Sequence, residues 1–160
     1  MTSSARAMDI TIPQRRIPSF ATAAADVPWV PIGDGKAVKP LRFFREHRGY
    51  VGLLRVDAGV LVPWHRHTGE VHAFNLEGWR ELDTGERIGP GGYVYEPPGN
   101  VDSWRAVGDE PVVVLVVVRG AVEHLDQAGA VTQRHDAASL HERYVQHCAE
   151  HGITPRELGE

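Results

Sequence analysis

The segment Leu61-Val-Pro-Trp-His-Arg-His67 is the most informative part of the sequence for both the fold and the candidate site. Its residues suit a β-strand, in which side chains two positions apart point to the same face. His65 and His67 therefore share a face with Leu61 and Pro63, and we expect that face to be the interior. Two neutral imidazoles that meet inside a protein suit iron, zinc, copper or nickel. The spacing alone fits equally well a pair of partly buried histidines that are hydrogen-bonded to the backbone and hold no metal.

Short runs of strand-forming residues surround this stretch and indicate an all-β protein. Turn sequences such as Asp83-Thr-Gly85 and Gly89-Pro-Gly-Gly92 separate them. Many short strands at regular spacing predict a sandwich or a closed barrel. The run 112–118 is apolar on both faces, so we expect the barrel core on one side and another layer or subunit on the other. The expected strands are 29–32, 41–44, 50–56, 59–64, 71–77, 93–96, 101–106, 112–119 and 121–125.

One α-helix is expected near the C-terminal end, at about 136–151, packed across the outside of the barrel. Asp136 is a favourable N-cap residue, and Gly152 can end the helix in a left-handed conformation. Between them Leu140, Tyr144 and Cys148 recur every four residues and form one apolar stripe.

The length and composition predict one cytoplasmic domain. The chain has 160 residues and a formal net charge of −4, and its one cysteine excludes an internal disulfide. We expect residues 27–160 to form the domain and residues 1–26 to be a flexible arm, in which 9–12 could add a strand to a neighbour. The mild acidity argues against nucleic acid as a partner. No apolar run is long enough to cross a membrane, and no signal-peptide pattern is present.

Two spacings resemble the sequence motifs of the cupin family. Gly59, His65 and His67 have the spacing of the first motif. The second motif corresponds to Gly91-x5-Pro97-x-Gly99-x2-Asp102, and it normally ends in a histidine, where this chain has aspartate. The glutamate that usually follows the histidine pair is also absent from its expected place.

Longer segments resemble the 2,4′-dihydroxyacetophenone dioxygenase family of cupins, over about residues 27–152. They include His65-Arg-His-Thr-Gly-Glu-Val-His72, Gly92-Tyr-Val-Tyr-Glu-Pro-Pro-Gly99 and Lys39-Pro-Leu-Arg-Phe-Phe44. The resemblance implies a double-stranded β-helix, or jelly-roll, barrel. It also implies oxygen-dependent cleavage of a carbon–carbon bond beside a ketone, at non-haem iron held by histidines. His65 and His67 match the first two ligands, and Asp102 matches the third.

The aspartate at position 102 leaves three accounts of the site open. Asp102 can be a ligand, which gives the two-histidine, one-carboxylate set of many Fe(II) oxygenases. It can instead be too short to reach the metal, which leaves a weak two-histidine site. In the third account the metal is lost and the barrel binds a small molecule.

Further residues are candidates for catalysis and substrate binding. His72 lies five positions after His67, so in an unbroken strand it would point to the opposite face. A bulge near Thr68-Gly69 would turn it to the interior, where it would be a candidate base or metal ligand. An outward-facing histidine is the alternative. Phe74, Trp104 and Glu96 are candidate substrate-binding residues. The other expected inward residues are Leu61, Leu76, Tyr93 or Val94, and Val114 or Leu115. Arg80 or Arg105 could hold an anionic oxygen, although strand arginines usually point outward.

The expected function is that of a metal-dependent dioxygenase acting on a small ketone or hydroxyketone and O₂. Fe(II) is the expected metal, with Zn, Ni, Mn or Cu as alternatives. A non-oxidative, metal-dependent cyclase, isomerase or hydrolase is the second hypothesis. The third is a non-catalytic ligand-binding or regulatory barrel. The open sheet edges of such a barrel and the doubly apolar run 112–118 also predict a homodimer.

Overall fold

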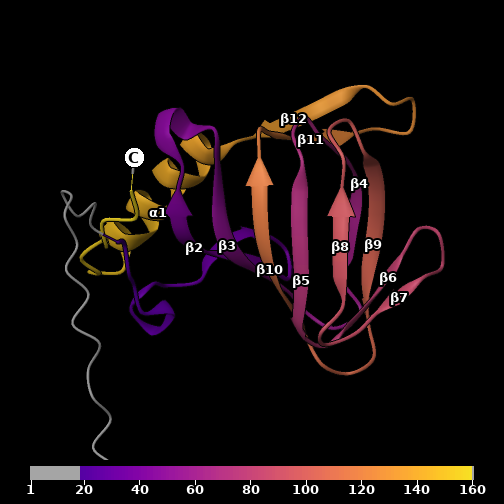
Figure 1. Cartoon of the computed structure of the whole chain (residues 1–160), viewed down its shortest axis with the longest axis horizontal. Coiled ribbons are helices and arrows are strands. Elements are labelled where there is room, and N and C mark those ends of the chain that lie inside the picture. Colours follow the sequence, from indigo (N-terminus) through magenta and orange to yellow (C-terminus); the bar gives the residue numbers. More distant parts are fainter. Residues whose placement is uncertain (1–18, 160) are drawn as a thin grey trace, which may run out of the picture.

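Two antiparallel sheets face each other in the computed structural model, which describes residues 19–159 (Figure 1). One six-stranded sheet has the order β1 (Val30–Gly33), β2 (Lys36–Phe43), β3 (Gly49–Val56), β10 (Val112–Arg119), β5 (Val71–Glu77) and β8 (Tyr93–Glu96). The other has the order β12 (Val131–His135), β11 (Val122–Leu125), β4 (Leu61–His67), β9 (Val101–Val107), β6 (Trp79–Leu82) and β7 (Arg87–Ile88). Two short 3-10 helices, Ala24–Asp26 and Arg45–His47, lie before β1 and before β3.

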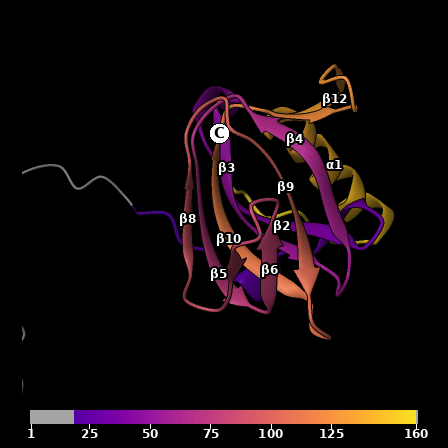
Figure 2. The same ribbon diagram turned by 90° about the vertical axis from the view of Figure 1, so that its right-hand side faces the viewer.

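The expected all-β jelly-roll barrel is confirmed. From β3 to β6 and again from β7 to β11, consecutive strands alternate between the two sheets, and Figure 2 shows the sheets curving around a common interior. The strands expected at 71–77, 93–96 and 112–119 have those bounds as β5, β8 and β10. The expected strand at 9–12 and most of the expected arm 1–26 lie outside the described residues.

Three short strands were not expected from the sequence. β6 and β7 form a hairpin whose turn and strands are rich in charged residues, so their alternation of apolar and polar residues is weak. β12 pairs with β11 and is mostly exposed, so it too carries little apolar pattern. These strands extend the edges of the sheet that carries the candidate site.

The barrel interior holds one apolar core, and a second lies beneath the C-terminal helix. The interior core takes buried side chains from both sheets, with Trp104 as its largest member. The second core joins residues of β1 and β2 to the stripe Leu140, Tyr144 and Cys148 of the helix.

The helix α1 (Ala137–Glu150) lies outside the barrel beside β1 and β2, as expected (Figure 1). Asp136 caps it, because its side chain accepts a hydrogen bond from the Ser139 amide while the Ser139 hydroxyl accepts one from the Asp136 amide. Within the described residues no helix has the length and apolar character needed to cross a bilayer.

Candidate metal centre

His65 and His67 lie at the end of β4 and point into the barrel, where they are only 5% and 6% exposed. The neighbouring strand β9 brings Asp102 directly opposite His65. The expected interior face of β4 is correct for the two histidines and wrong for Leu61, which is 46% exposed, and for Pro63, which is also exposed. The cause is a register shift between Val62 and His65, which turns Val62 inward instead.

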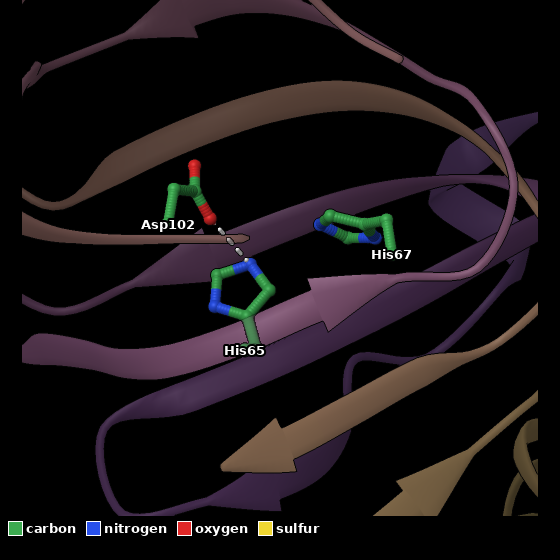
Figure 3. Close-up of side chains that lie close together, drawn as sticks. All are labelled: His65, His67 and Asp102. Carbon is green, nitrogen blue, oxygen red and sulfur yellow. Dashed lines mark ion pairs between the residues drawn. The ribbon is translucent and has the colours of Figure 1, made fainter. Parts of the chain in front are cut away.

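The ligand atoms of His65, His67 and Asp102 all lie within 4.8 Å of one another. Figure 3 shows the Asp102 carboxylate pointing at the His65 ring, with the His67 ring beside them. The two imidazole rings are nearly perpendicular, with centroids 4.8 Å apart. The geometry therefore brings together the three residues that the sequence singled out as candidate ligands.

The donor atoms of this cluster fit a divalent cation. His65 Nδ1 lies 2.8 Å from the Pro63 carbonyl oxygen, so a neutral ring donates its proton there and leaves a lone pair on Nε2. That Nε2 lies 2.9 Å from Asp102 Oδ1, which has no aligned hydrogen-bond partner among the described residues. His67 Nδ1 is likewise buried without a partner in this part of the chain. Converging, unsatisfied electron pairs are what a metal ion or a shared proton would satisfy.

The pKa values in the cluster reflect burial and mutual charge. Burial and the neighbouring His65 lower the pKa of His67 to about 4, so His67 is neutral and able to coordinate. Burial disfavours the charged form of His65. The hydrogen bond and the negative charge of Asp102 favour that form more strongly, so the His65 pKa is raised. Burial likewise opposes ionisation of Asp102, and contacts with His65 outweigh it, so the Asp102 pKa is lowered. The carboxylate is therefore ionised, the form that binds metal.

Glu96 places a second carboxylate beside the cluster. It lies at the end of β8, buried, with Oε2 3.7 Å from His67 Nε2, and Asn100 donates a hydrogen bond of 3.0 Å to its Oε1. Burial and the nearby Asp102 charge raise the pKa of Glu96 to about 7. Glu96, expected to bind substrate, is thus at the cavity and able to hold or release a proton near neutral pH.

His72 and Phe74 do not reach the cavity, and their expected inward placement is corrected. Strand β5 buries Val71 and Ala73 and turns the alternate side chains outward, and its pairing with β8 is regular from Val71 to Phe74, so His72 stays on the outer face. The His72 ring contacts the Tyr93 hydroxyl at 2.7 Å on the outer face. Phe74 is 41% exposed on the same face. The outer face also holds Leu76 and Tyr93, while Val94 and Val114 face inward.

A cavity of about 490 Å³ opens beside the cluster. Its walls are mainly apolar and include Trp104, the third candidate substrate-binding residue. Arg80 also lines it, although strand arginines usually point outward, and so do His124 and His135. Only strand register could have revealed His124, because β11 pairs it with His65.

A family model, the ChrR cupin-like domain, matches residues 18–123. The chain belongs to this cupin family. No curated sequence matches the chain. Its fold is similar to that of an RmlC-like cupin protein from Ralstonia eutropha, with a TM-score of 0.83 at 23% identity over 90% of this chain and 96% of that chain.

Two other structural relatives of this cupin differ in what their names describe. An acetylacetone dioxygenase from Acinetobacter johnsonii has a TM-score of 0.69 at 16% identity, covering 87% of this chain and 99% of that chain. The anti-sigma protein ChrR from Rhodobacter sphaeroides, solved with SigE, has a TM-score of 0.52 at 24% identity, covering 59% and 49%. At these identities the similarities show the shared fold, which serves enzymes and regulators alike.

Proposed function

We propose that this cupin is an Fe(II)-dependent dioxygenase that cleaves the carbon–carbon bond beside the carbonyl group of a small hydroxyketone or diketone. The observation that carries the proposal is the convergence of His65, His67 and Asp102 on one buried point. Two histidines and one carboxylate leave coordination positions open for substrate and O₂, which is the ligand set of many Fe(II) oxygenases. Such an ion would coordinate the substrate oxygens and supply electrons to dioxygen.

The residues of the chain would orient the substrate and handle its proton. The apolar wall around Trp104 would hold the substrate and exclude water from the reacting atoms. The buried Glu96 carboxylate would accept the hydroxyl or enol proton of the substrate at Oε2 and return it later, because Oε2 lies 3.7 Å from His67 Nε2, beside the metal-binding candidates. In the net reaction one O₂ is consumed for each ketone, and both oxygen atoms enter the two carbonyl or carboxyl products.

A second candidate function is a metal-binding regulatory module without catalysis. The match to the ChrR cupin-like domain favours it, because the ChrR structure is named as an anti-sigma protein. A non-oxidative Lewis-acid enzyme remains the other alternative to O₂ chemistry, and it would use the same three ligands.

Oxygen uptake separates these functions. Protein loaded with Fe(II) under argon is mixed with 2-hydroxyacetophenone or acetylacetone and then exposed to O₂. His67→Ala is the inactive variant, and His147→Ala, on α1 outside the barrel, is its control. We expect uptake of one O₂ for each ketone consumed, lost in His67→Ala and kept in His147→Ala. Ketone conversion under argon would favour the Lewis-acid enzyme. A protein that retains iron and converts none of a panel of ketones would favour the regulatory module.

A further inference from the structure

Arg80 is a buried arginine with an unused donor inside the barrel. It lies on β6 with its side chain turned inward, and it is only 4% exposed. Its Nε donates a hydrogen bond of 2.9 Å to Asn75 Oδ1, whereas its Nη2 is buried without a hydrogen-bond partner among residues 19–159. A buried guanidinium with an unsatisfied N–H destabilises a fold unless another group completes it. The Nη2 is therefore a candidate contact for a ligand.

The surrounding residues hold the Arg80 guanidinium in place. Asn75 is fully buried, and its Nδ2 donates to the Ile88 carbonyl oxygen at 3.2 Å, which fixes the Oδ1 that Arg80 contacts. The Trp104 ring lies 5.2 Å from Arg80 Cζ, within the range of a cation–π interaction. A guanidinium restrained in this way is prepared for an anion, because little side-chain freedom is lost on binding.

The position of Arg80 relative to the metal centre sets the size of the ligand. Asp102 and Trp104 lie two residues apart on β9, opposite His65 and Val62 of β4, so their side chains turn to the same face. Two residues of a strand span roughly 7 Å. The guanidinium packs against Trp104, two residues along β9 from Asp102, and from this spacing we infer a ligand with one aromatic ring or a short chain between its two ends.

The charges of the cavity also favour an anion. A divalent cation on two neutral histidines and Asp102 leaves one positive charge, and Arg80 adds another. Glu96 can cancel at most one of these two charges. A cavity that keeps a net positive charge behind apolar walls attracts a negatively charged ligand more strongly than a neutral one.

We propose that Arg80 binds a carboxylate of the substrate through Nη2, while the ketone end of the same molecule reaches the metal centre. The substrate class is then a ketone or hydroxyketone acid, with an aromatic ring or short chain between its two ends against Trp104. This inference rests on the proposed function, because it takes the His65–His67–Asp102 cluster as the point where the ketone binds.

A pair of probes that differ only in a carboxylate tests the inference by binding, without turnover. The neutral probe is 1-phenylbutane-1,3-dione, and the charged probe is the same diketone with a 4-carboxylate on its ring. Each is titrated calorimetrically under argon into full-length, Fe(II)-loaded protein. The variants are Arg80→Gln and Arg80→Lys, with Arg105→Gln as the matched control, since Arg105 is an exposed arginine of β9.

We expect wild type and Arg105→Gln to bind the charged probe about 10- to 100-fold more tightly than the neutral one, the range of a charge-assisted hydrogen bond. Arg80→Gln should abolish this preference and leave the affinity for the neutral probe within about threefold, which also shows that the variant is folded. Arg80→Lys should keep part of the preference. A wild-type protein that binds both probes equally, or an Arg80→Gln variant that retains the preference, would overturn the inference and leave the proposed function intact. A wild type that binds neither probe would contradict both.

Discussion

Replacing Glu96 with glutamine should change how the stability of the metal-free protein depends on pH. Glutamine keeps the Oε1 acceptor for Asn100 and removes the ionisable group. In the folded protein, burial and the nearby Asp102 raise the Glu96 pKa from 4.5 to about 7. The folded state therefore holds a proton on Glu96 that the unfolded chain has already released between about pH 5 and pH 7.

This difference lowers the free energy of unfolding of wild type as the pH rises through the Glu96 pKa. A rise from 4.5 to about 7 corresponds to about 3 kcal/mol at 1.36 kcal/mol per pH unit, present below the unfolded pKa and lost above the folded one. Asp102 acts in the opposite sense, but its lowered pKa places its effect below about pH 4, outside the range tested. His67 also acts in the opposite sense, and its contribution is present in wild type and variant alike.

Urea denaturation of chelator-treated protein at pH 5, 6, 7 and 8 measures the effect. We expect Glu96→Gln to gain stability relative to wild type between pH 5 and pH 8, by an amount that approaches about 3 kcal/mol. Glu110→Gln, which alters an exposed carboxylate in the turn before β10, is the control and should show no such gain. A constant difference in stability between Glu96→Gln and wild type across this range would contradict a raised Glu96 pKa in the folded protein.

Three further predictions follow from the placement of individual residues. Asp136→Ala should lower the free energy of unfolding by about 1 kcal/mol in urea denaturation, because it removes the cap of α1; an unchanged midpoint would contradict the capping role. His72→Ala should leave the iron content and the affinity for 1-phenylbutane-1,3-dione unchanged, since the ring lies on the outer face; a lost iron would contradict the corrected placement. Tyr95→Arg should convert the expected homodimer to a monomer in sedimentation analysis, because exposed Tyr95, Tyr93 and Phe74 form an apolar outer face of β5 and β8 suited to a second copy; a wild-type monomer would refute this.

The sequence predicted the bounds of β5, β8 and β10 best. β5 and β10 carry apolar residues on the faces that they bury, whereas β8 is bounded by the turn sequence 89–92 and by Pro97. β12 and the β6–β7 hairpin are held by pairing at the sheet edges, and exposed polar residues there give no periodic signal. The helix α1 was predictable because its cap and its apolar stripe are both local features.

The candidate site was predictable only where motif spacing specified it. His65, His67 and Asp102 came from the cupin spacings, and the fold brings them together. The inward turn of Val62 in place of Leu61 depends on a bulge that leaves no mark in the sequence. Arg80 could be considered as an anion-binding residue, but its burial depends on Asn75 and Trp104, which only the folded sheets bring beside it.

The metal centre is tested most directly by the metal content of protein purified without added metal, measured by elemental analysis. Asp102→Ala is the test variant, and Asp109→Ala, in the exposed turn before β10, is the matched control. We predict about one iron per chain in wild type and in Asp109→Ala, and loss of that iron in Asp102→Ala, because three ligands hold the ion. Equal iron in Asp102→Ala would remove Asp102 from the ligands. An absence of metal in every protein, even after reconstitution with Fe(II) under argon, would contradict the metal centre and the dioxygenase proposal together.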